Sequence, residues 1–79
     1  MRYYIHVKDG QTILDEEGAE FSNLDAVKNN AIRASGEMVR SLNHGENFWS
    51  GEPWKLWVTD GPNSTGNTIL ELDFIGKLL

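Results

Sequence analysis

The carboxylates near the start of the chain come nearest, by type and spacing, to a metal-binding or acid–base site. Six of the twelve acidic residues fall between positions 9 and 25, a stretch without Lys or Arg. Clustered carboxylates are the ligands that hard divalent cations prefer. Their spacing is not the D-x-[DN]-x-[DN]-G pattern of a calcium loop, and Asp15-Glu16-Glu17-Gly18 is typical of an exposed turn. We therefore expect a solvated acidic turn and no metal site. The six residues are Asp9, Asp15, Glu16, Glu17, Glu20 and Asp25.

Two further features resemble catalytic or cofactor-binding motifs. His6 lies in a predicted strand, but a general base needs a hydrogen-bonding partner and a pocket that excludes water, which a flat sheet face does not offer. The run Gly61 to Thr68 resembles the phosphate-binding loop G-x-x-x-x-G-K-[ST]. Asn67 stands where that loop has its Lys, and a strand follows where the loop has a helix. We predict no catalytic residue and no cofactor.

Aromatic side chains on one strand face are the remaining candidate site. The alternation of the predicted strands puts Tyr4, His6 and Trp57 on the same face, with Ile69 beside them. Trp and Tyr are enriched at protein interfaces, and an apolar patch on a small domain commonly has a use. The same residues are also typical of ordinary cross-strand pairs that stabilise a solvated face. Few cations accompany them, and the formal charge is −5, so the pattern argues against nucleic acid.

Length and composition limit the architecture that can position these residues. Seventy-nine residues form one domain, covering positions 1–79. The chain has no cysteine, which excludes disulfides, thiolate catalysis and zinc bound by Cys. No apolar run reaches the roughly 18 residues of a membrane span. The start, Met1-Arg2-Tyr3-Tyr4, leads directly into a strand pattern, so we expect a cytoplasmic protein without a signal peptide.

Hydrophobic periodicity predicts four strands and one helix. Apolar and polar residues alternate over 2–8, 54–60 and 68–74, and a shorter strand is expected at 12–15. Asp9-Gly10 predicts a hairpin turn between the first two strands. A two-residue loop would turn Leu14 inward and a longer loop would turn Ile13 inward, so the register is open.

The helix is predicted from Leu24 to Leu42, about 19 residues at the helical period. Ser22 or Asn23 would cap its start, and Asn43-His44-Gly45 would end it. Its apolar stripe contains Leu24, Val27, Ala31, Ala34, Met38 and Leu42, flanked by Ile32 and Val39. One helix is too narrow to cover a four-stranded sheet, and Phe48 and Trp49 or Leu78 and Leu79 would supplement it.

These elements define an α+β fold with two layers. The predicted order ββαββ gives a four-stranded antiparallel sheet, and strand order 2-1-3-4 keeps every neighbour antiparallel. The amphipathic helix packs on one face of the sheet. The opposite face, which carries Tyr4, His6 and Trp57, has no predicted cover.

Several segments together resemble a family of small uncharacterised proteins of soil-dwelling alphaproteobacteria. The family begins R-Y-[YF]-F-[HD]-[LV]-[RK]-D-G, and this chain has Arg2-Tyr3-Tyr4-Ile5-His6-Val7-Lys8-Asp9-Gly10. A D-x-E-G turn corresponds to residues 15–18, and the later W-x-V-T-D and I-L-x-L-x-F motifs resemble the second hairpin. The chain is longer than the family at 43–53 and 61–67. The family is a domain of unknown function, so the resemblance implies a bacterial protein and no activity.

Taken together, the sequence predicts a non-enzymatic protein-interaction domain. The expected contact surface is the uncovered sheet face with Tyr4, His6, Trp57 and Ile69, which would bind a protein partner or a second copy. The alternative is a minor hydrolase or metal-dependent activity at the acidic turn with His6. No membrane contact is expected.

Overall fold

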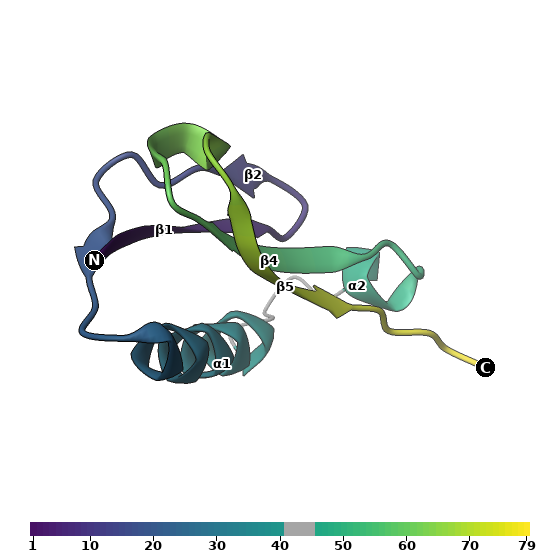
Figure 1. Cartoon of the computed structure of the whole chain (residues 1–79). Coiled ribbons are helices and arrows are strands. Elements are labelled where there is room, and N and C mark those ends of the chain that lie inside the picture. The colour runs from purple at the N-terminus through teal and green to yellow at the C-terminus, as the bar shows by residue number, and fades with distance from the viewer. Residues whose placement is uncertain (41–45) are drawn as a thin grey trace.

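A computed structural model describes residues 1–40 and 46–79 and shows a sheet layer above a helix layer (Figure 1). The sheet is antiparallel, with order β2-β1-β4-β5, and β3 pairs with the start of β1. The predicted α+β class is confirmed. The sheet has five strands where four were predicted, because β3 adds to the predicted path of four strands beside β1. Two short elements, β3 and α2, were not predicted. The strands are β1 (Arg2–Lys8), β2 (Thr12–Ile13), β3 (Ala19–Glu20), β4 (Trp54–Thr59) and β5 (Thr68–Phe74), and the helices are α1 (Leu24–Arg40) and α2 (Glu46–Trp49).

The hydrophobic core lies between β4 and α1. Leu56 and Val58 of β4 are fully buried against Val27 and Ala31 of α1. In the ladder between β1 and β4, Ile5 pairs with Val58 and Val7 pairs with Leu56, so these residues share the inner face. The strict alternation in both strands is what makes this face apolar.

Helix α1 begins at a side-chain cap. The Oδ1 atom of Asn23 accepts a hydrogen bond from the backbone N–H of Ala26 at 2.9 Å, so Asn23, of the two predicted candidates, is the cap. The buried side chains of α1 are Val27, Ala31 and Ser35, which follow one another at four-residue spacing. Leu24, predicted on the inner stripe, is 42% exposed. The predicted helix end, Leu42 with Asn43-His44-Gly45, lies outside the described residues.

The first hairpin takes the longer of the two loops that the sequence left open. Val7 pairs with Ile13 and Lys8 with Thr12, so the loop has three residues, Asp9 to Gln11. The backbone N–H of Asp9 donates to the carbonyl oxygen of Gln11 at 3.0 Å. Gly10 has φ +97°, in the left-handed region that glycine adopts without steric cost.

The segment before β4 extends the core at one end. Phe48 of α2 is buried and packs edge-on against Trp54, with 5.2 Å between ring centroids. Trp49, Leu78 and Leu79, the other predicted supplements, are exposed. Neither described helix is long and apolar enough to cross a membrane.

Leu56→Ala should lower the free energy of unfolding by about 2–5 kcal/mol, because it leaves a cavity under α1. Leu24→Ala removes the same atoms from an exposed site at the helix start and should cost less than about 1 kcal/mol. Urea denaturation of both variants measures the difference. Equal losses would show that β4 does not carry the core.

Candidate functional site

Two loops cover the outer face of the sheet, so the expectation that this face is uncovered is wrong. One loop is the acidic turn after β2, and the other connects β4 to β5 through a tight turn at Pro62–Ser64. The two loops meet where the backbone N–H of Asn63 donates to the carbonyl oxygen of Asp15 at 2.9 Å. Period-two alternation places side chains on a face, but it says nothing about loops that fold back over that face.

His6 lies beneath these loops and is 0% exposed, contrary to its predicted place on an open surface. The backbone N–H of Asp15 donates to His6 Nδ1 at 3.0 Å. A backbone amide only donates, so Nδ1 is unprotonated and the proton of the neutral ring is on Nε2. His6 Nε2 then donates to Thr59 Oγ1 at 2.8 Å, and that hydroxyl donates to the carbonyl oxygen of Gly61 at 2.7 Å. This chain of three hydrogen bonds joins both loops to β1 and β4.

The side chain of Asp15 organises the acidic turn. Its Oδ1 accepts hydrogen bonds from the backbone N–H groups of Glu17 and Gly18, and its Oδ2 accepts one from Ile5. Burial by itself would raise the pKa of Asp15, but the three backbone donors, together with nearby His6, hold it below its ordinary value. Asp15 is therefore an ionised structural group at neutral pH.

Gly18 lets the same turn approach the sheet closely. Its φ is +70°, and a Cβ atom there would lie 2.7 Å from the ring of Tyr4 and 2.9 Å from the carbonyl oxygen of Tyr3. Any larger residue would push the turn away from β1. The D-x-E-G motif thus has a physical explanation: its Asp binds the turn's amides and its Gly fits against Tyr4.

Trp57 fixes the second loop. Its ring packs on His6 with 5.3 Å between centroids, and its Nε1–H donates to Ser64 Oγ at 2.9 Å. Asn63 and Ser64 both have positive φ, 55° and 65°, a conformation that is costly for non-glycine residues. The hydrogen bond from Trp57 holds Ser64 in place, and the hydrogen bond to the Asp15 carbonyl oxygen holds Asn63 in place.

The predicted contact face is therefore only partly available. Tyr4 and Trp57 are half-buried, and each contacts one of the covering loops. Ile69 does not lie on this face, because a bulge opposite Val58 and Thr59 breaks the alternation of β5 and Ile69 packs against the core cluster. His6 is interior.

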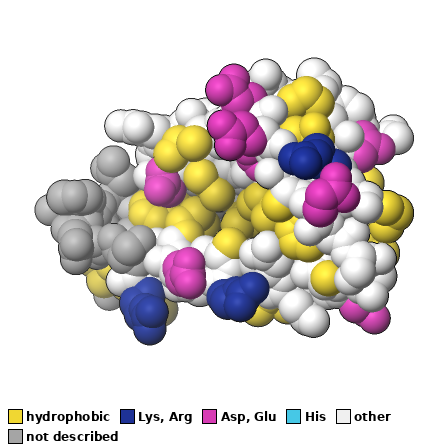
Figure 2. All heavy atoms as spheres, turned by 90° about the vertical axis from the view of Figure 1, so that its left-hand side faces the viewer, with side chains coloured by type: hydrophobic (Ala, Val, Ile, Leu, Met, Phe, Trp, Pro, Cys, Tyr) yellow, Lys and Arg dark blue, Asp and Glu magenta, His cyan; other side chains and the backbone are white. Residues whose placement is uncertain are grey.

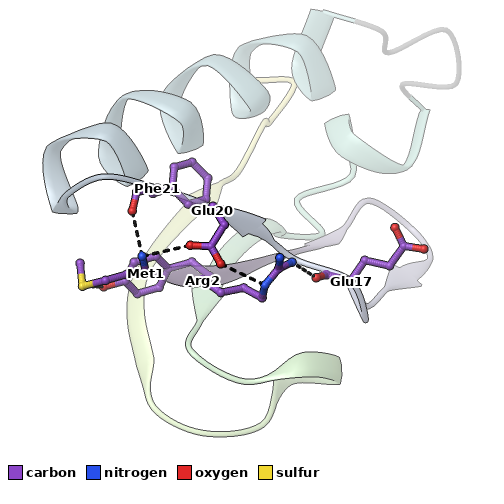
Figure 3. Close-up of polar contacts among 6 residues, drawn as sticks. Met1, Arg2, Glu17, Glu20 and Phe21 are labelled. Carbon is purple, nitrogen blue, oxygen red and sulfur yellow. Dashed lines mark hydrogen bonds and ion pairs between the residues drawn. The ribbon is translucent and has the colours of Figure 1, made fainter.

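The acidic turn and His6 do come together, but their polar atoms are already used. Both ring nitrogens and both carboxylate oxygens of Asp15 have protein partners. Glu20 forms ion pairs with the α-amino group of Met1 and with Arg2, whose guanidinium also donates to the carbonyl oxygen of Glu17 (Figure 3). Within residues 1–40 and 46–79, no three His, Asp or Glu side chains are grouped as a metal ion would need.

A second feature, missed from the sequence, lies between α1 and β5. Two adjacent hollows of 170 and 360 Å³ open there, and both are lined by Ile32 and Leu72. We call them the α1/β5 groove. Figure 2 shows apolar side chains gathered between the helix layer and the sheet layer, with charged groups around them. The full lining is Lys28, Ala31, Ile32, Ser35, Gly36, Val39, Leu70, Glu71, Leu72 and Phe74.

The groove contains two unusual positions. Ile32 is 65% exposed although it is a large apolar residue. Ser35 is 4% exposed, and its hydroxyl has no hydrogen-bond partner. The signal in the sequence was the wide apolar stripe of the helix, in which Ile32 and Val39 flank the inner face and find no strand to cover them.

The stability of the domain should depend on the protonation of His6. Burial lowers the pKa of His6 by disfavouring the charged ring, and the opposing effect of Asp15 is smaller. The unfolded chain, with a pKa near 6.5, therefore binds more protons than the folded chain just below that pH. The free energy of unfolding should be constant above about pH 6.5 and should fall between about pH 6.5 and 5, at no more than about 1.4 kcal/mol per pH unit. His6→Gln should show no such slope in denaturant titrations, and parallel curves for the two proteins would contradict the assignment.

Asp15→Asn should destabilise the domain by about 1–3 kcal/mol, because the amide nitrogen cannot accept the hydrogen bond from Ile5 and a part-buried N–H group loses its partner. Glu16→Gln, a change of the same kind on the adjacent exposed residue, should stay within about 0.5 kcal/mol of the wild type. Urea denaturation at pH 7 compares them. Similar effects of the two changes on the free energy of unfolding would show that the Asp15 carboxylate does not stabilise the turn.

The comparisons with known proteins place the chain in a family without giving it an activity. No curated protein and no solved structure matches it. A family model for a domain of unknown function, DUF6894, matches residues 2–75. The match spans every strand and helix described above, and the chain therefore belongs to the DUF6894 family.

Proposed function

We propose that this domain is a non-enzymatic protein-interaction module that accepts an extended segment of a partner protein along β5. The observation that carries the proposal is the coincidence of an open sheet edge with the α1/β5 groove. Among the described residues β5 pairs only with β4, so its other side presents seven residues of backbone without a strand partner. The groove lies directly beside that edge.

The two edges of the sheet differ in a way that supports this choice. The β1 edge is occupied by the two-residue strands β2 and β3 and by the Asp15 turn. Such short, covered edges are how proteins prevent unwanted pairing. Strand addition at an open edge gives affinity through main-chain hydrogen bonds and selectivity through pockets for alternate side chains. β5 offers the hydrogen bonds, and the groove offers the pockets.

We place the contact at β5 because His6, the centre of the predicted aromatic face, is interior and Tyr4 and Trp57 hold loops. We retain the expectation that the partner is a protein. We also retain the bacterial cytoplasm as the setting, on the basis of the family resemblance and of a sequence without cysteine. The hydrolase alternative has no observation in its favour, because the carboxylate oxygens of Asp15 and the ring nitrogens of His6 are already hydrogen-bonded within the protein.

A neutral extended heptapeptide, with alternating valine and threonine and blocked ends, serves as the test ligand. Titration into the ¹⁵N-labelled domain should shift the amides of β5 and of the groove-facing part of α1. Ile32→Asp should abolish these shifts, because it puts a charge at the exposed rim of the groove.

Ile13→Asp is the matched control, since Ile13 is 54% exposed on β2 at the opposite edge of the sheet. It should bind the peptide as the wild type does, and circular dichroism should show both variants folded. Peptide shifts around Tyr4 and Trp57 with none at β5, or equal loss in both variants, would contradict the proposal.

A further inference from the structure

The charges on β5 select the kind of segment that the edge can receive. Glu71 and Asp73 lie on the outer face of β5, opposite Trp57 and Lys55 of β4, and both are exposed. Glu71 forms an ion pair with Lys55 at 3.2 Å. Asp73 has no ion pair among the described residues. The outer side of the open edge is therefore acidic, in a chain whose formal charge is −5.

These acids disfavour a second copy of the chain as the occupant. Two β5 strands that pair antiparallel in one continuous sheet bring like faces together. The Glu71 and Asp73 side chains of one copy would then lie beside the same acids of the other. Like charges directly opposite one another destabilise a strand pair, so self-pairing is opposed at neutral pH.

The inner side of the edge favours an occupant with apolar side chains. Leu70, Leu72 and Phe74 of β5 line the groove, with Ile32 opposite them on α1. Lys28 and Glu71 both line the smaller hollow, so its two charged side chains offset one another and give a cationic side chain no net attraction into the groove. Ser35 lines the larger hollow, but its hydroxyl is buried beneath the groove and is not offered to the occupant.

We propose that the occupant is an extended segment of a different protein in which apolar side chains alternate with Lys or Arg. The inference rests on the proposed function and adds the chemistry of the partner. The apolar side chains enter the α1/β5 groove, and the cations lie on the outer face beside Glu71 and Asp73. Complementary charge sets the choice of partner, while main-chain pairing and the groove supply the common affinity.

Three blocked heptapeptides test this choice, with valine alternating with lysine, threonine or glutamate. Dissociation constants come from the amide shifts of β5 in the wild-type domain at low ionic strength. The lysine peptide should bind about tenfold more tightly than the threonine peptide, and the glutamate peptide more weakly than both. The advantage of lysine should shrink in about 0.5 M salt, because these charges are exposed.

Two double variants with equal changes in net charge test which acidic residues cause the preference for lysine. Glu71→Gln with Asp73→Asn should remove the preference for lysine, so that this variant binds the lysine and threonine peptides with equal affinity. Glu16→Gln with Glu17→Gln, on the acidic turn, should keep the preference.

The possible failures are distinguishable. Equal binding of the lysine and threonine peptides at β5 would overturn the charge inference and leave the proposed function standing. Binding of no peptide at β5 would overturn both. Shifts of the β5 amides that grow with protein concentration alone would identify a second copy as the occupant and overturn this inference.

Discussion

The arrangement of the outer face depends on one buried, neutral histidine. His6 is enclosed by the sheet and two loops, and each of its ring nitrogens has a fixed partner of defined direction. Because the amide of Asp15 donates to one nitrogen and Thr59 receives from the other, a single tautomer fits. Enclosing the ring requires both loops to lie close to the sheet. This close approach is made by Gly18, by Trp57 and by the left-handed Asn63–Ser64 pair.

The two faces of the sheet consequently have different roles. The outer face is closed by loops that hydrogen-bond to it and to one another. The inner face has one long helix, about 10–12 Å wide with its side chains, under a five-stranded sheet whose main path crosses four strands spaced about 4.8 Å apart. Because α1 lies over β4, the strand at the far edge, β5, is left with a groove beside it. The groove is thus a consequence of covering the path β2-β1-β4-β5 with one helix.

Sequence patterns predicted what depends on periodicity. Alternation correctly assigned Val7 and Leu56 to the inner face of the sheet and His6 and Trp57 to the other face, and the helical period located α1. The predictions that failed concern contacts that do not repeat at a regular spacing along the sequence. The cover over His6 arises from side-chain-to-backbone bonds of Asp15 and Thr59, and the inward turn of Ile69 comes from a bulge. The groove was missed because it depends on where α1 lies across the sheet, which residue spacing does not specify.

The central claim is that β5 and the α1/β5 groove form the binding surface, and contact mapping tests it most directly. Intermolecular nuclear Overhauser effects would be recorded between the labelled domain and the valine–lysine heptapeptide. We expect contacts from valine methyls to Ile32 and Leu72, together with contacts between the peptide backbone and β5. Contacts confined to Tyr4 and Trp57, with none to β5, would contradict it.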